Sequence, residues 1–346
     1  MMTTAMTDGD RRAEAGADTA LLSVADLSIS FGSPNGTVHA VNGISFEVAP
    51  RERVAIVGES GSGKSVTAQA LLGLLPTASI TGRIAFDGRD VLTMPNAELR
   101  ALRGAEMSYV FQDPLSSLDP VRSIGDQVCQ PLRIRGVSRK EAKARALDML
   151  AAVGIPDPAR RYGDYPHQFS GGMRQRVMIA MALIGEPRLV VADEPTTALD
   201  VRVQAKIIDL LYALTEERGV AVVFITHDLG IVAGFADRVM VMYAGRVMES
   251  CVTDDLYYRS INPYTLGLLQ SLPRITGPIP EKLSTIGGRP PSPSDLPPGC
   301  AFHPRCRYVR DICRTETPVL HVPQDGQHPS ACHVAGWLAE EPGVLR

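Results

Sequence analysis

A chain of 346 residues, 45% of them hydrophobic, is long enough to bury a substantial core, and we expect one main domain with an appendage. Its 35 Lys and Arg nearly balance its 38 Asp and Glu, so a net charge of -3 gives no electrostatic reason to expect nucleic acid as a partner. The longest apolar runs, such as 178–185, are far shorter than the roughly 20 residues of a membrane-spanning helix, and we expect no such helix.

The first residues differ in character from the rest of the chain. Residues 1–20 have no periodic apolar face, which predicts a disordered tail, and no apolar stretch of the kind found in a secretory signal. We therefore expect the chain to remain in the cytoplasm. Apolar and polar residues then alternate in 22–31 and again in 43–48, which predicts a half-buried antiparallel sheet with a turn at 34–36.

A short apolar segment, 53–57, precedes a glycine-rich loop, and helix-compatible spacing follows it through residue 75. The loop reads Gly58-Glu59-Ser60-Gly61-Ser62-Gly63-Lys64-Ser65, and this strand, loop and helix together are typical of a phosphate-binding loop. Glycines let consecutive N–H groups face phosphate oxygens, a lysine adds positive charge for the outer phosphates, and a serine offers a hydroxyl to Mg²⁺. We assign nucleotide binding to Gly58, Ser60, Gly61, Gly63, Lys64 and Ser65.

The middle of the chain is predominantly helical in pattern. Residues 97–185 predict a helical subdomain, with a capping box at Ser138 and Glu141 and a helix stop at Gly154. Continuous apolar segments at 189–192 and 221–226 predict parallel strands covered on both faces, joined by a helix over 203–218. We expect these elements to belong to one nucleotide-binding domain over residues 21–271.

The strand predicted at 189–192 is followed by two carboxylates, Asp193 and Glu194. Burying two acids is costly unless they serve a metal or a reaction. We predict that Asp193 holds Mg²⁺ and that Glu194 polarises the water that attacks the terminal phosphate of the nucleotide. The alternative, that both acids only cap the next helix, is weaker beside a phosphate-binding loop.

A second predicted anion-binding helix terminus lies about a hundred residues after the first. The segment Phe169-Ser170-Gly171-Gly172-Met173-Arg174-Gln175-Arg176 opens a helix with a serine and two glycines. It resembles the signature motif of ATP-binding cassette (ABC) proteins, with methionine where many members have glutamine, a replacement familiar in the peptide-importer branch. The resemblance implies that Ser170, Gly171 and Gly172 contact nucleotide.

Four further residues resemble elements of the same family. Gln112 resembles the Q-loop glutamine that contacts Mg²⁺ and relays movement to membrane subunits, and Asp200 resembles the D-loop aspartate that crosses the dimer interface. His227 resembles the switch histidine that contacts the terminal phosphate. Phe31 resembles the aromatic residue that stacks on adenine, although a phenylalanine at a strand end is about as often a core residue.

The resemblance implies an α/β fold: a P-loop ABC nucleotide-binding domain with a RecA-like core, an antiparallel β subdomain and a helical subdomain. In this family two cassettes bind head to tail around two ATP molecules, and the signature residues of one complete the site of the other. This chain carries one cassette. It is therefore expected to pair with a second ABC ATPase subunit, either a second copy or, as we predict, a homologous, non-identical chain.

The sequence after the cassette resembles one branch of the family. Residues 262–265, 268–269 and 297–306 resemble the C-terminal extension of dipeptide and oligopeptide importer ATPases. This resemblance implies an ATP-hydrolysing motor at the cytoplasmic face of the inner membrane, with two permease subunits and an extracytoplasmic peptide-binding protein as partners. Alternatives are an importer of nickel or another small solute and, from a different class, a soluble cassette ATPase in translation or DNA repair.

Proline and cysteine dominate the end of the chain, and we predict a small C-terminal module over residues 272–346. Four thiols in a segment with few core residues suggest a metal that staples it, although their spacing is not the usual one for zinc. The family resemblance implies a 4Fe-4S cluster, whereas zinc and unliganded or disulfide-bonded cysteines are the alternatives. The residues concerned are Cys300, Cys306, Cys313 and Cys332.

Overall fold

The computed structural model describes residues 20–34, 36–197, 199–272, 285–321 and 328–340. Residues 1–19, most of the predicted disordered tail, lie outside this part of the chain. Within the described residues, no helix is both long enough and apolar enough to cross a membrane.

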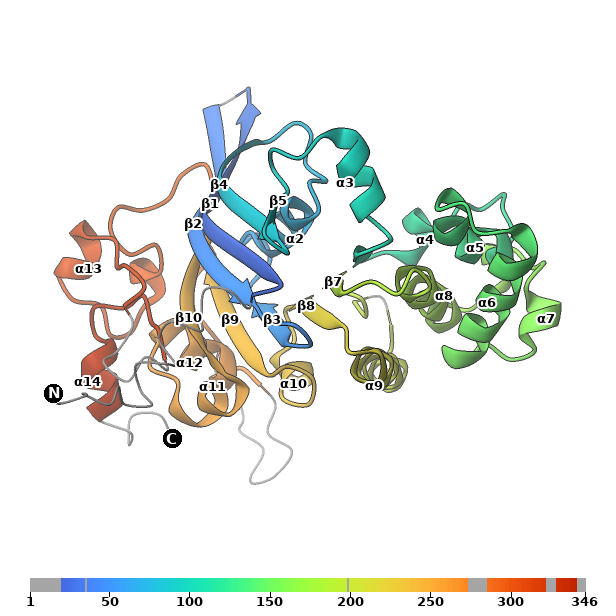
Figure 1. Cartoon of the computed structure of the whole chain (residues 1–346). Helices are drawn as coiled ribbons and strands as arrows, with labels where there is room; N and C mark the ends of the chain where they lie inside the picture. Colours follow the sequence, from blue (N-terminus) through green and yellow to red (C-terminus); the bar gives the residue numbers. More distant parts are fainter. Residues whose placement is uncertain (1–19, 35, 198, 273–284, 322–327, 341–346) are drawn as a thin grey trace, which may run out of the picture.

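A four-stranded antiparallel sheet forms one layer of the molecule. Its strand order is β2-β1-β4-β5, and the alternating pattern predicted two of these strands and their pairing. In Figure 1 the sheet lies above the second, larger sheet. The strands are β1 (Leu22–Ser33), β2 (Gly36–Val48), β4 (Ser79–Phe86) and β5 (Arg89–Asp90).

The larger sheet has six strands in the order β10-β9-β3-β8-β7-β6. All neighbouring pairs are parallel except β10 with β9, which is antiparallel. Parallel strands end at the same edge, so the loops after β3, β6, β7 and β8 meet there. The strands are β3 (Arg53–Val57), β6 (Met107–Val110), β7 (Leu189–Asp193), β8 (Ala221–Thr226), β9 (Arg238–Tyr243) and β10 (Arg246–Val252).

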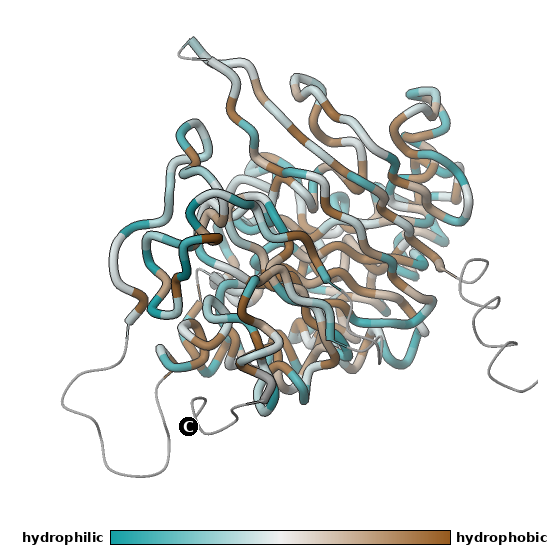
Figure 2. The backbone as a smooth tube through the Cα atoms, turned by 90° about the vertical axis from the view of Figure 1, so that its left-hand side faces the viewer, coloured by the Kyte–Doolittle hydropathy of each residue, from teal (hydrophilic) through white to brown (hydrophobic). Residues whose placement is uncertain are grey.

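Helix α2 (Lys64–Leu71) lies between the two sheets and contacts β2 of one and both β7 and β8 of the other. A single hydrophobic cluster contains side chains of α2 and of both sheets, and Figure 2 shows hydrophobic segments gathered in this interior. The helix ends four residues before the predicted position 75, because Gly73 takes a positive φ of 63°. Because α2 packs against both sheets, its first residues and the phosphate loop that precedes them are held against a rigid core.

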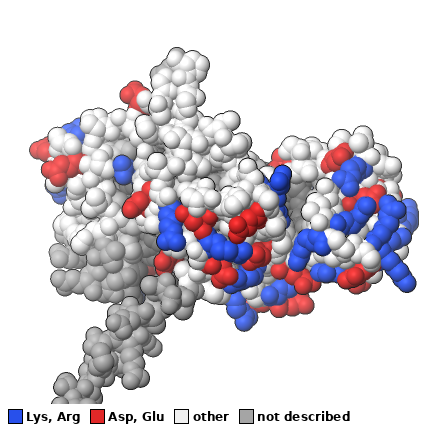
Figure 3. All heavy atoms as spheres, turned by 45° about the horizontal axis from the view of Figure 1, so that its top comes forward, with Lys and Arg blue, Asp and Glu red and all other residues white. Residues whose placement is uncertain are grey.

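A group of helices projects to one side of the sheets (Figure 1). Ser138 Oγ accepts a hydrogen bond from the Glu141 N–H at 3.2 Å, which is one half of the predicted capping box. Gly154 takes φ 73° after the helix ends, as the sequence predicts. Figure 3 shows basic side chains over these helices with acidic ones among them. The helices are α4 (Pro114–Ser117), α5 (Ile124–Ile134), α6 (Arg139–Ala152), α7 (Pro158–Arg161), η1 (Pro166–Gln168) and α8 (Gly171–Leu183).

Other helices cover the sheet or connect its strands. The interval 97–185 is not helical throughout, because it contains β6 of the large sheet. The helix predicted over 203–218 is α9, which begins two residues earlier. The remaining helices of the cassette are α3 (Asn96–Leu102), α9 (Val201–Arg218) and α10 (Leu229–Val232).

The described residues that follow β10, called the C-terminal region below, pack against the large sheet. Residues 329–331 bind along β10, where the Ala331 N–H donates to Met248 O at 2.8 Å. Phe302 joins an aromatic cluster with Tyr243 and Tyr264, at ring centroid distances of 5.3 and 5.2 Å. The region therefore shares the core of the cassette. Its elements are α11 (Thr253–Arg259), α12 (Pro263–Gln270), η2 (His303–Arg305), α13 (Ile312–Thr315) and α14 (Ala335–Glu340).

The prediction of a 4Fe-4S cluster on Cys300, Cys306, Cys313 and Cys332 is wrong. In the described part of the chain, no group of three or more His, Cys, Asp or Glu side chains could hold a metal ion. The four cysteines are free and border a cavity of about 20 Å³, which has room for about one water molecule. Burial raises the pKa of Cys306 to about 11 and that of Cys332 to about 12, so these thiols stay protonated at neutral pH.

Candidate nucleotide site

The loop between β3 and α2 is shaped by glycines that no other residue could replace without strain. Gly58 and Gly63 have φ of 149° and 100°, a region that residues with a Cβ rarely adopt. A Cβ on Gly58 would lie 2.1 Å from Met242 O, and one on Gly63 would lie 2.5 Å from Ala40 O. The loop backbone can therefore curl as closely as a phosphate-binding loop requires only with glycine at these positions.

The cavity above this loop has a volume of about 740 Å³. It gathers residues that lie far apart in the sequence, since the loops after β3, β6, β7 and β8 all open into it. Of the residues predicted for the site, it is lined by Gly58, Ser60, Gly61, Gly63, Lys64, Ser65, Gln112, Glu194 and His227.

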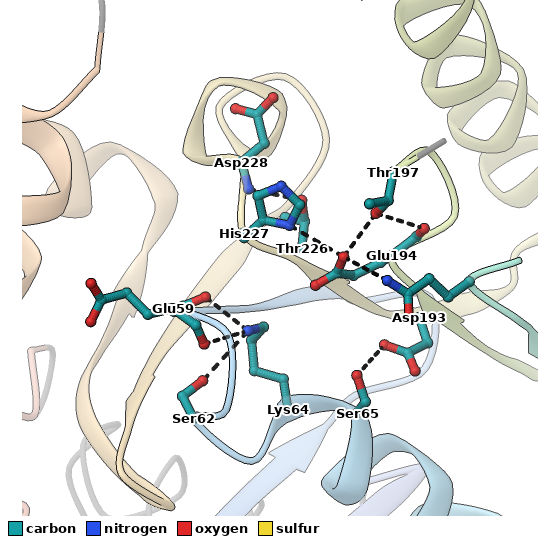
Figure 4. A network of polar contacts seen from close by, with 12 residues as sticks. Glu59, Ser62, Lys64, Ser65, Asp193, Glu194, Thr197, Thr226, His227 and Asp228 are labelled. Atoms are coloured by element: carbon teal, nitrogen blue, oxygen red, sulfur yellow. Dashed lines mark hydrogen bonds and ion pairs between the residues drawn. The ribbon is translucent and has the colours of Figure 1, made fainter. Parts of the chain in front are cut away.

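Lys64 is buried at the base of the cavity. Its ammonium donates to Gly58 O at 2.8 Å and to Glu59 O at 2.9 Å (Figure 4). Desolvation lowers the pKa of Lys64, and the negative charges of Glu194, Asp193 and Glu59 oppose that shift. A cation held among acidic groups and carbonyls is placed to exchange these partners for phosphate oxygens.

Ser65 and Asp193 form the oxygen-rich part of the site. Ser65 Oγ donates to Asp193 Oδ1 at 2.9 Å, and Tyr109 Oη donates to Asp193 Oδ2 at 2.8 Å. Burial raises the pKa of Asp193, while both hydrogen bonds favour its charged form. A hydroxyl beside a carboxylate is the kind of hard oxygen donor pair that Mg²⁺ prefers, so these residues fit the Mg²⁺ expected from the sequence.

Glu194 lies at the meeting point of three strand ends. Its carboxylate accepts hydrogen bonds from Thr197 Oγ1 at 2.8 Å and from Gln112 Nε2 at 3.2 Å. His227 Nδ1 lies 3.2 Å from the same carboxylate, as Figure 4 shows. The backbone of Glu194 has φ 44°, an unfavourable value for a residue with a side chain, and such strain is common at functional sites.

The structure does not bring every predicted residue to this cavity. Asp193 is not among the described residues that line it, although it is hydrogen-bonded to Ser65, which does. The other predicted residues outside the lining are Phe31, Ser170, Gly171, Gly172 and Asp200. Ser170 instead caps α8, Asp200 caps α9 and Phe31 packs half-buried against the core between the sheets. Within one chain, Ser170 and Asp200 therefore stand at the starts of α8 and α9 and outside the lining of the phosphate-loop cavity.

Sequence reasoning missed several residues of the site. Tyr109 and Thr197 orient Asp193 and Glu194, and Leu268 and Pro290 of the C-terminal region line the cavity. Tyr109 reaches Asp193 because β6 pairs with β7 in a register that sets Tyr109 opposite Val191. No local pattern signals that pairing, although the tyrosine lies only three residues before Gln112.

A phosphate loop at the carboxyl edge of a parallel sheet, with acidic residues at the end of a neighbouring strand, defines a P-loop nucleoside triphosphatase. Comparison with known proteins gives the family. Residues 41–197 match the model described as "ABC transporter", and residues 248–313 match that described as "Oligopeptide/dipeptide transporter, C-terminal region".

Individual relatives agree with both matches. The oligopeptide transport ATP-binding protein OppD of Salmonella typhimurium is 50% identical over 301 residues, covering 86% of this chain and 90% of that protein. The dipeptide transport ATP-binding protein DppD of Bacillus subtilis is 47% identical over 325 residues, covering 93% of this chain and 95% of that protein. A dimeric post-hydrolysis structure of the ATP-binding cassette MJ0796 with ADP and Pi has a TM-score of 0.61 at 30% identity, covering 67% of this chain and 98% of that one. The chain belongs to the ABC transporter family of ATP-binding proteins.

Proposed function

We propose that this chain is the ATP-hydrolysing motor subunit of an importer of dipeptides or oligopeptides. The observation that carries the proposal is the match of the C-terminal region, residues 248–313, in addition to the cassette. Relatives that align with 86% and 93% of this chain are described as oligopeptide and dipeptide transport ATP-binding proteins. The cassette alone would support only an ATPase of unspecified cargo.

The proposed roles of the site residues follow from their positions. Backbone N–H groups of the loop and the Lys64 ammonium bind the phosphates of ATP, while Ser65, Asp193 and Gln112 hold Mg²⁺. The metal, when bound, neutralises negative charge on the phosphates. Glu194 orients and deprotonates the attacking water, and His227, which is within 3.2 Å of that carboxylate, contacts the terminal phosphate.

A second ATPase chain would complete the site. We propose that Ser170, Gly171, Gly172 and Asp200 serve the nucleotide of a partner cassette, which would be a homologous, non-identical chain. Their separation from the phosphate loop of their own chain supports this role. Phe31 would stack on adenine.

We further propose that residues 21–271 are the nucleotide-binding domain and residues 272–346 a small C-terminal extension specific to peptide importers. The helical subdomain, about 97–185, would pass closure of the two cassettes to two permease subunits through the Q-loop at Gln112. The chain would then lie on the cytoplasmic face of the inner membrane as a peripheral subunit. An extracytoplasmic binding protein would deliver the peptide.

Purification of the tagged chain from detergent-solubilised membranes tests this proposal. Two permease subunits and a second ATPase should co-purify, and the complex in proteoliposomes with its binding protein should take up a labelled tripeptide when ATP is present. Uptake of nickel instead of peptide would assign the small-solute alternative. Recovery of the chain without any membrane subunit would overturn the importer assignment.

A further inference from the structure

The nucleotide cavity has one wall that the cassette motifs do not supply. Leu268 of α12 and Pro290, both in the C-terminal region, line it beside Glu59 of the phosphate loop. The Glu59 N–H donates to Tyr264 Oη of α12 at 2.9 Å. The C-terminal region thus contacts the phosphate loop directly, at the residue that follows its first glycine.

The strongest of these contacts joins Glu59 to Arg305, in η2. Arg305 Nη1 and Nη2 lie 2.6 and 2.9 Å from the two carboxylate oxygens of Glu59, a bidentate pair. The Arg305 side chain is 5% exposed and that of Glu59 is 25% exposed, so water screens the pair weakly. Arg305 Nε also donates to Gly287 O at 2.8 Å, which fixes the guanidinium from a second side.

Glu59 connects this arginine to the lysine of the site. While its carboxylate binds Arg305, its carbonyl oxygen accepts from the Lys64 ammonium at 2.9 Å. Figure 4 shows the Glu59 carboxylate directed away from Lys64. Without Arg305, a free carboxylate beside the phosphate loop would repel the phosphates of ATP, and the carbonyl that holds Lys64 would lose its anchor.

We propose that Arg305 is a positioning residue for the phosphate loop. Arg305 neutralises the charge of Glu59 and fixes its position. The packing of the C-terminal region, which holds Arg305, thereby sets the affinity of the loop for ATP. The inference rests on the proposed role of the loop in ATP binding and is independent of the transported substrate. Because linkage is reciprocal, ATP binding should also stabilise the backbone hydrogen bonds of residues 300–306.

The test is the Kd of the purified full chain for Mg-ATP, measured by titration calorimetry. Arg305→Ala should raise this Kd about tenfold or more, because a partly buried carboxylate loses its partner. Arg305→Lys, which keeps the charge but not the bidentate geometry, should have an intermediate effect. Arg307→Ala, an exposed arginine two residues away, is the matched control and should leave the Kd unchanged.

A double variant separates electrostatic positioning from a loss of folding. In Glu59→Gln/Arg305→Ala the repulsive carboxylate is gone, so the Kd should return to within about threefold of that of Glu59→Gln alone. A merely structural role of Arg305 would leave the double variant as weak as Arg305→Ala, and that result would overturn the inference. The Kd of the wild-type chain is the reference for all variants. If the wild-type chain itself did not bind ATP, that result would refute the proposed function and not the role of Arg305.

If Arg305→Ala does not fold, amide hydrogen exchange of the wild-type chain tests the linkage between ATP binding and the C-terminal region independently. The amides of Cys300 and Arg305 donate to Cys313 O and Phe302 O within the C-terminal region. Saturating Mg-ATP should slow their exchange about tenfold. Unchanged exchange of these amides, with ATP bound, would contradict the proposed linkage.

Discussion

Replacement of Glu194 by glutamine tests the chemistry of the site in isolation. Thr197 Oγ1 and Gln112 Nε2 hold the carboxylate at 2.8 and 3.2 Å, so an amide of the same shape should occupy the same position. What Glu194→Gln loses is the ability to accept a proton from water. General base catalysis contributes about 10²–10⁴-fold, so kcat should fall by that factor, or about 3–5 kcal/mol in the activation free energy.

Steady-state ATP hydrolysis by the purified transporter measures this effect, and calorimetry gives the Kd for ATP alongside it. The Kd should change by less than about threefold, because the proposed phosphate contacts come from the loop and Lys64. Glu186→Gln is the matched control, since Glu186 pairs with Arg145, is 68% exposed and is not among the described residues that line the cavity. A kcat for Glu194→Gln within threefold of wild type would refute the assignment and shift attention to His227 as the proton acceptor.

Three other predictions address the phosphate loop, the metal and the half-buried Cys306 thiol. Gly63→Ala would place a Cβ 2.5 Å from a backbone carbonyl oxygen at φ 100°, so the affinity for ATP, measured by calorimetry, should fall more than tenfold. Gly163→Ala is the control, because a Cβ there meets open space, and it should bind ATP as the wild type does. Ser65→Ala should raise the Mg²⁺ concentration for half-maximal hydrolysis about tenfold, and Ser65→Thr, which keeps the hydroxyl, should not. The pKa of Cys306 is raised to about 11, above its unfolded value of about 8.5, so this thiol contributes stability that is complete below pH 8.5 and lost as pH rises toward 11. The Tm should therefore fall between pH 8.5 and 11, and less so in Cys306→Ala; an equal fall in both would exclude this thiol as a cause.

Much of the site could be predicted from the sequence because its physics is local. A glycine-rich loop between a strand and a helix binds phosphates through its own backbone, and the structure places that loop between β3 and α2. The carboxylates at 193 and 194 ended a continuous apolar segment, and they lie at the end of the buried strand β7. Such features depend on neighbours in the sequence and need no knowledge of tertiary contacts.

Other features depend on contacts between distant segments and were therefore out of reach. β6 is a four-residue strand inside a segment of helical pattern, and it is too short for its periodicity to distinguish strand from helix. The pair of Glu59 with Arg305 joins residues 246 positions apart. The 4Fe-4S prediction came from the family resemblance and was wrong, because a resemblance does not determine how much room lies between the thiols.

Peptide-stimulated ATP hydrolysis tests most directly whether this ATPase drives peptide import. The measurement compares the hydrolysis rate of the membrane complex with its binding protein empty and loaded with di- to pentapeptides. We predict that loaded binding protein stimulates hydrolysis and that the stimulation disappears in Glu194→Gln. A rate that is the same with empty and peptide-loaded binding protein would contradict the peptide-import account.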